Sequence, residues 1–364
     1  MKTLYLYLTR QVVLTLLLTM GVFLFVMLLG EGMRDVMSLL VSRKVALGDV
    51  FKAVGLLVPF VLAYALPMGL LTATLLVFGR FSADQELIAA RSNGISLTAL
   101  IPPILLLGVL CCGLSAWINL DLAPRSRVAF KQLVFDLGVK SPAEFLTSGA
   151  LLEAGGADGA WGYIGRRSGD RLEKILVSRL KGGELVQRTT AERGTVRFDE
   201  ESQKLALELE GVVNHLKIND NWIPTSADGF SMDFDLEPVY RALREPKLSE
   251  MTFEQLRLKI LEFELQGADS MVARVHLHRQ ISGSFACFGF VLIGIPLGLR
   301  AHRRETIAGV AIATMLVCLY YGLVVFAQSM ETRAALRPDL LMWAPNVLFQ
   351  IIGGALIWRA GRGA

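Results

Sequence analysis

Two oppositely charged residues, Glu86 and Arg91, have the types and spacing needed to bind another protein. They lie in a polar segment, residues 79–96, that separates two long apolar runs. Ionised side chains at the two ends of a short helix can each form an ion pair across an interface. The segment therefore predicts a docking element, and its chemistry is binding rather than catalysis.

The same segment carries start and stop signals for a helix. Ser82 precedes Gln85 by three residues, which is the spacing of a capping box and predicts that the helix begins there. Asn93 and Gly94 predict its end. A helix this short is marginal unless it packs against something. Two interpretations of this helix stay open. It could bind in a cleft of a separate protein that hydrolyses ATP, or it could lie at the lipid interface.

The residue pattern does not favour an enzyme. The sequence has no G-x-x-x-x-G-K-[ST] phosphate loop and no Ser/His/Asp set. The four cysteines lie inside apolar runs without zinc spacing, and no basic run interleaves with aromatic residues as a nucleic-acid surface requires. We predict no metal, no cofactor on this chain and no nucleic-acid partner, with ATP used by a partner ATPase. The histidines lie outside the apolar runs: His215, His276, His278 and His302.

The charged residues of segment 79–96 must be positioned by the helices on either side of it, and these are predicted to span a membrane. The 364 residues are 53% hydrophobic and 19% charged, which is too apolar for a soluble protein of this length. A helix needs about 20 apolar residues to cross the bilayer. Six runs, nearly free of ionised side chains, satisfy this: residues 12–30, 54–78, 97–118, 281–299, 307–327 and 340–358.

Basic residues near the span ends predict the orientation, because Lys and Arg are retained in the cytoplasm. Lys2 and Arg10 precede the first span, and Arg80 and Arg91 lie between the second and third. Both termini are therefore expected in the cytoplasm. The connection between the first two spans, which this topology places outside, disagrees with the rule because it also carries basic residues: Arg34, Arg43, Lys44 and Lys52.

A polar stretch between the third and fourth spans predicts a β domain on the outer side. Residues 174–178, 194–198, 204–210 and 230–236 alternate apolar and polar side chains, as half-buried strands do. The predicted fold is six transmembrane helices (3+3) with an inserted periplasmic all-β, jelly-roll-like domain. The expected domains are 1–120 with a coupling helix at about 82–96, a β domain at 121–250, a connecting helix at 251–275, and 276–364.

The sequence resembles the LptF/LptG (YjgP/YjgQ) permeases over nearly the whole chain. Asp84-Gln-Glu-Leu-Ile-Ala-Ala-Arg-Ser-Asn-Gly-Ile-Ser96 is similar to that family's coupling helix. His278-Arg-Gln, the stretch Ile293-Gly-Ile-Pro-Leu-Gly298 and the ending Trp343-Ala-Pro-Asn346 are also similar to family patterns. Gln280 departs from the second basic residue usual after Arg279. The resemblance implies that the ATPase-coupling residues are Asp84, Glu86, Leu87, Arg91 and Gly94.

The resemblance also implies a function and a set of partners. The expected protein is a permease subunit of an ABC exporter in the bacterial inner membrane that extracts lipopolysaccharide and passes it to a periplasmic bridge of jelly-roll proteins. Its partners would be an LptB-like ATPase dimer, a second LptF/LptG-type permease and an LptC-like protein. Arg34 and Arg333, near the outer ends of spans one and five, are the expected substrate-binding cations, because arginine binds phosphate well.

Two other functions remain compatible with the residues. An apolar cavity with a few cations discriminates poorly among anionic lipids, so the chain fits an ABC permease for another anionic lipid or for a lipoprotein. It also fits a non-transporting membrane scaffold whose β domain binds periplasmic partners. The scaffold predicts that Glu86 is dispensable and that no ATPase copurifies.

Overall fold

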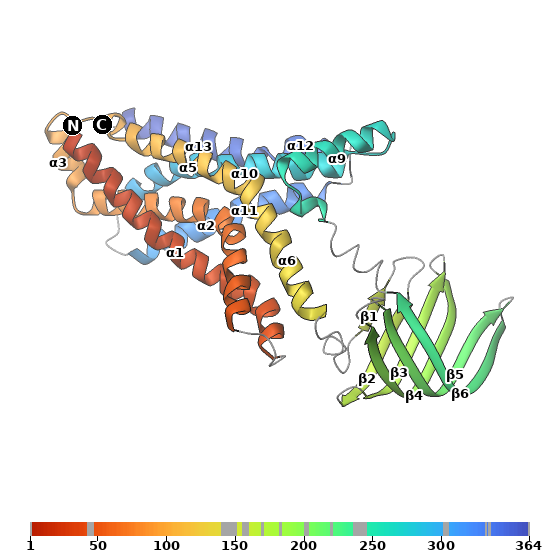
Figure 1. The fold of residues 1–364 in the computed structure, drawn as a ribbon. Coiled ribbons are helices and arrows are strands. Elements are labelled where there is room, and N and C mark those ends of the chain that lie inside the picture. Colours follow the sequence, from red (N-terminus) through yellow and green to blue (C-terminus); the bar gives the residue numbers. More distant parts are fainter. Residues whose placement is uncertain are drawn as a thin grey trace. The chain divides into compact units, whose positions relative to one another are not determined.

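The computed structural model describes residues 2–41, 47–139, 151–154, 160–168, 171–181, 184–199, 204–218, 221–235, 246–300, 306–331, 333 and 336–362. The chain divides into two compact units. The helical unit comprises Met1–Phe130 and Lys247–Ala364, and the β unit comprises Lys131–Pro246. Figure 1 shows the elements of both units.

Six helices among the described residues are long and apolar enough to cross a membrane, which confirms the predicted number of spans. A helix suits this environment because it satisfies its backbone hydrogen bonds internally. The long helices are α1 (Lys2–Val41), α2 (Leu47–Ala83), α5 (Pro102–Trp117), α10 (Met271–Arg300), α11 (Thr306–Ser329) and α13 (Ala344–Arg362). The shorter ones between or before them are α3 (Glu86–Ser92), α4 (Leu97–Leu100) and α12 (Pro338–Leu341).

The third and fourth spans are longer than their apolar runs. α5 continues through a π-helical turn, η1 (Ile118–Leu122), into α6 (Ala123–Val139), so the boundary predicted at residue 121 falls inside a helix. α10 begins at Met271, so His276 and His278 lie in its first turns and not outside the span, as the sequence had indicated. Hydropathy marks only the part of a helix that contacts lipid, whereas backbone hydrogen bonding continues beyond it.

The return from the β unit to the spans passes through two short elements, η3 (Leu248–Glu250) and α9 (Phe253–Leu265). α9 lies in the region expected to hold a connecting helix. A reciprocal capping box starts it, in which the backbone N–H of Thr252 donates to Oε1 of Gln255 at 2.9 Å.

α10 is the central helix of the bundle, since 67% of its apolar stretch is buried. Glycines allow its neighbours to approach closely, as small residues do in membrane bundles. A Cβ added at Gly298 would lie 2.8 Å from the carbonyl oxygen of Leu75 in α2. One added at Gly353 of α13 would lie 2.7 Å from the backbone carbon of Leu292 in α10.

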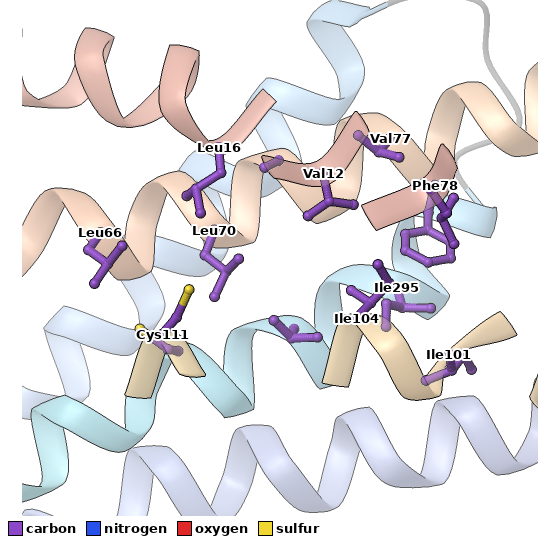
Figure 2. Packing of buried hydrophobic residues seen from close by; sticks show 14 of the residues in the cluster. Val12, Leu16, Leu66, Leu70, Val77, Phe78, Ile101, Ile104, Cys111 and Ile295 are labelled. Atoms are coloured by element: carbon purple, nitrogen blue, oxygen red, sulfur yellow. The ribbon is translucent and has the colours of Figure 1, made fainter. Parts of the chain in front are cut away.

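The main hydrophobic core joins α1, α2, α5 and α10 (Figure 2). Val12 and Leu16 of α1 face Leu70 of α2, and Ile104 of α5 lies near Ile295 of α10. Burying these side chains against one another replaces lipid contacts by close protein packing.

A polar contact joins α10, α11 and α13 inside a second cluster. Asn346 is 1% exposed, accepts a hydrogen bond from the hydroxyl of Tyr320 at 2.9 Å and donates one to the carbonyl oxygen of Ser282 at 2.6 Å. Phe290 and Phe349 contact the ring of Tyr320 in edge-on geometry. Polar side chains buried between spans hold helices together because each finds its partner on another helix.

The second unit is a six-stranded antiparallel sheet, which confirms the inserted β domain. Its strands are β1 (Leu151–Ala154), β2 (Ala160–Ser168), β3 (Arg171–Lys181), β4 (Glu184–Asp199), β5 (Lys204–Ile218) and β6 (Asn221–Asp235). The strand order is sequential from β1 to β6, so the described strands form a meander without the crossovers of a Greek key. The alternating segments fall in β3 to β6, apart from residue 236, which lies outside the described residues. Asp199 of β4 pairs with Lys204 of β5.

Candidate functional site

The short helix α3 starts at a backbone turn and not at a side-chain cap. α2 runs on to Ala83, and Gln85 takes a left-handed conformation with φ 59° and forms no side-chain cap. The hydroxyl of Ser82 instead donates to the carbonyl oxygen of Leu299 at 3.0 Å. The predicted capping box is therefore wrong, because α2 extends past Ser82 and brings this hydroxyl against the end of α10.

The end of α3 agrees with the prediction. Gly94 has φ 77°, a conformation that favours glycine. Its amide donates to the carbonyl oxygen of Arg91 at 2.9 Å, and the amide of Ile95 donates to that of Ala90 at 3.0 Å. These bonds satisfy carbonyl groups that the end of a helix leaves unpaired.

α3 has one packed face and one open face. Leu87 packs against the main core, and Ala90 is buried. On the open face the side chain of Ile88 is 58% exposed. The exposed residues around it are small or polar: Gln85, Ala89 and Ser92. An apolar side chain flanked by polar ones on an exposed helix face suits contact with another surface.

The charged residues of α3 lie at the helix ends that favour them. Glu86 is in the first turn and Arg91 in the last, so both charges complement the helix dipole. Among the described residues neither forms an ion pair within the chain. Nε of Arg91 is buried without a hydrogen-bond partner, and Asp84 is exposed. The charges of Glu86 and Arg91 thus have no counter-charge in the part of the chain that the structure describes.

Two tyrosines at the start of α1 bond to this region. The hydroxyl of Tyr7 donates to Oε1 of Glu86 at 3.1 Å, and the hydroxyl of Tyr5 donates to the carbonyl oxygen of Ala99 at 2.8 Å. In Figure 1, α3 lies at the end of the helical bundle that carries both ends of the chain. The start of α1, α3 and the end of α10 therefore meet at one end of the bundle.

The two arginines expected to bind substrate lie at the opposite end. α1 and α11 both run away from α3, since α1 begins beside it and α11 follows the end of α10. Arg34 belongs to the last turns of α1, and its side chain lies outside the described residues. Arg333 is exposed just beyond α11, where its amide donates to the carbonyl oxygen of Met330 at 2.9 Å.

α1, which carries Arg34, and α11, which ends shortly before Arg333, are the least covered of the six spans. Only 17% of the apolar stretch of α1 and 22% of that of α11 are buried within this chain. Large apolar side chains line their open faces, including Phe25 and Phe326, which are 63% and 61% exposed. Both helices thus leave apolar surface free for lipid or for another protein.

The family of the chain follows from its sequence. The family model described as Lipopolysaccharide export system permease LptF/LptG matches residues 6–359. The chain belongs to this family. The match runs from the first turns of α1 to the last turns of α13 and includes the β unit, so this permease is a multi-pass membrane protein of lipopolysaccharide export, a transporter and not an enzyme. No curated protein matches its sequence.

Two sequence patterns of the permease meet in the structure. Nε1 of Trp343 donates to Nδ1 of His278 at 3.1 Å. The stretch His278-Arg-Gln near the start of α10 therefore contacts the stretch Trp343-Ala-Pro-Asn346, which leads into α13. Arg279 donates to Oε1 of Gln328 in α11 at 3.1 Å, and Gln280 donates to the carbonyl oxygen of Met251 at 2.9 Å. These sequence stretches therefore hold helices together. Gln280, which stands where the family usually has a basic residue, donates its hydrogen bond to a backbone carbonyl oxygen.

Sequence reasoning missed Tyr7 and Tyr5 in the permease. Tyr7 is 79 residues from Glu86, and Tyr5 is 94 residues from Ala99. No local spacing rule relates residues so far apart. Only the packing of α1 against α2 brings them to α3.

Proposed function

We propose that this permease is one of two related subunits of an ABC exporter in the bacterial inner membrane, driven by a separate cytoplasmic ATPase that docks on α3. The observation that carries the proposal is the open face of α3. It offers Ile88 for apolar contact, with Asp84 exposed beside it, and the half-buried Glu86 and Arg91 lie at its edges for ion pairs.

The basic residues support a cytoplasmic position for α3. Arg80 precedes it, Arg91 lies in its last turn, and Lys2, Arg10 and Arg359 belong to the helix ends at the same end of the bundle. Lys and Arg near span ends are retained in the cytoplasm. With this orientation both termini are cytoplasmic, and the β unit is periplasmic because it is inserted between α6 and η3.

The open helices α1 and α11 support a route for the substrate. Lipopolysaccharide carries acyl chains and phosphates, and the two helices combine exposed apolar surface with Arg34 and Arg333 at their outer ends. Arginine forms strong hydrogen bonds with phosphate. We propose that the acyl chains enter between this chain and the second permease, and that the β unit passes the molecule to an LptC-like protein and a periplasmic jelly-roll bridge.

Copurification tests the coupling. The full chain is extracted in mild detergent from cells that express all its partners, as wild type and as Glu86→Ala. We expect an ATPase and a second permease to copurify with wild type, and the ATPase to be lost or strongly reduced with Glu86→Ala while the second permease stays bound.

A matched control separates this from a general loss of charge. Glu254 is a carboxylate at the surface as well, exposed where Glu86 is half-buried, and it lies on α9. Glu254→Ala should retain the ATPase. If wild type brings down no ATPase under gentle extraction, the exporter is wrong and a non-transporting scaffold is the better account. If an ATPase associates but depletion of the chain leaves lipopolysaccharide transport unchanged, another anionic lipid or a lipoprotein is the substrate.

A further inference from the structure

Tyr7 contacts the residue on which the proposed coupling depends. Its hydroxyl donates to Oε1 of Glu86 at 3.1 Å across 79 residues of sequence. The side chain of Tyr7 is 43% exposed, and that of Glu86 is half-buried, so the pair lies at the surface of the bundle end that carries α3. A partner docked on α3 would therefore meet both side chains.

The bond occupies only part of the carboxylate. An ionised carboxylate accepts about four hydrogen bonds over its two oxygens. Tyr7 uses Oε1, and no hydrogen bond from the described residues reaches Oε2 of Glu86. A phenol that holds one oxygen also restricts the side-chain rotamers of Glu86. A restricted side chain loses less conformational entropy when a partner binds it.

The bond also joins α3 to α1. α1 is one continuous helix from Lys2 to Val41, and few of its residues are buried by the rest of the chain. Because the helix is continuous, a displacement at its first turns acts along α1 and on α2, against which Leu8, Val12 and Leu16 pack in the main core. Tyr7 lies in those first turns.

Resting on the proposed function, we infer that Tyr7 is a positioning residue for coupling. It holds Oε1 of Glu86 so that Oε2 faces a cationic side chain of the ATPase, and it transmits the displacement of α3 to α1. Tyr7 itself needs no contact with nucleotide or lipid.

The test measures the affinity of the purified pair of permeases for the purified ATPase, and the lipopolysaccharide moved per ATP hydrolysed. Tyr7→Phe removes one hydroxyl and keeps the ring. We expect it to raise the Kd for the ATPase about twofold to fivefold, which is the range for one partly exposed hydrogen bond to a charged group. Transport per ATP should fall as well, with the melting temperature unchanged.

Two further variants separate positioning from folding. A 4-aminophenylalanine at position 7 keeps a donor at the same place and should restore the Kd. Tyr5→Phe removes the neighbouring bond to the carbonyl oxygen of Ala99, which does not involve Glu86, and should leave the Kd within about twofold of wild type.

The outcomes distinguish this inference from the proposed function. A Tyr7→Phe variant with wild-type Kd, or a Tyr5→Phe variant that raises the Kd equally, overturns the role of Tyr7 while ATPase docking stands. Failure of the amino variant to restore the Kd has the same meaning. If the wild-type permeases bind no ATPase, the proposed function falls first and this inference falls with it.

Discussion

At the scale of single residues, this permease relies on a few polar contacts between segments far apart in sequence. Tyr7 reaches Glu86, Trp343 reaches His278, and Asn346 bonds to two helices at once. A buried polar group is costly unless it is hydrogen-bonded, so the buried contacts of Asn346 favour one arrangement of the helices. The residues that carry the family resemblance include both structural contacts of this kind and the charged ends of α3.

Asn346 provides a test of these contacts. Asn346→Ala leaves the hydroxyl of Tyr320 and the carbonyl oxygen of Ser282 without their partner, which should destabilise the fold by about 1–3 kcal/mol. Thermal melting of the detergent-solubilised chain measures this. Ser329→Ala, which removes an exposed hydroxyl bonded within its own helix, should melt within error of wild type. Equal melting of Asn346→Ala and wild type would show that the contact adds nothing.

At the scale of elements, the bundle has a rigid centre and two open helices. α10 is held against α2 and α13 through glycine contacts. α1 also approaches α2 closely at Gly69, but α1 and α11 have the smallest buried shares of the six spans. Close backbone contact leaves no room for adjustment, because a backbone cannot rotate away as a side chain does. We expect α2 and α10 to move as one body, and α1 and α11 to change position during transport.

Two glycines of the same helix test the rigid centre. Gly298→Ala places a Cβ 2.8 Å from the backbone oxygen of Leu75, so α2 and α10 must separate. The expected loss of stability is about 1–3 kcal/mol. Gly283 lies in the same helix with nothing within 4 Å of an added Cβ, and Gly283→Ala should be neutral or slightly stabilising. Similar melting temperatures for the two variants would contradict the close contact of α2 and α10.

At the scale of the whole molecule, the two ends of the helical unit carry different chemistry. One end brings together α3, the start of α1 and the end of α10, and the other carries Arg34 and Arg333. The proposed exporter would use this division, since in that proposal energy is supplied on one side of the membrane and an anionic lipid is released on the other. The long helices connect the two ends, and α1 belongs to both.

Photo-cross-linking tests where lipopolysaccharide enters. A photoreactive amino acid at Phe25 of α1 or at Phe326 of α11 should cross-link to lipopolysaccharide in membranes, because both lie on the open helices. Leu110 of α5 and Ile351 of α13 are matched controls, with exposed fractions of 63% and 66%. They should cross-link weakly. Products confined to α5 and α13 would contradict the proposed route along spans one and five.

The sequence by itself determined the elements whose cause is local. The six apolar runs predict six spans because lipid excludes unpaired backbone groups. The alternating segments predict strands β3 to β6, since side chains on a strand point to opposite faces. Asn93 and Gly94 predict the end of α3, where only a left-handed residue reverses the chain.

Tertiary structure decided everything that depends on partners far along the chain. Ser82 has the spacing of a cap, but it bonds to Leu299 because α2 packs against α10 there. Spacing identified Glu86 but not Tyr7, since 79 residues separate the two. Hydropathy also ended the third span too early and began the fourth too late, because hydrogen bonding and not lipid contact sets the length of α6 and the start of α10. The periodicity of apolar residues indicates the environment of one segment. Which segments contact one another is determined only by the packing of the whole chain.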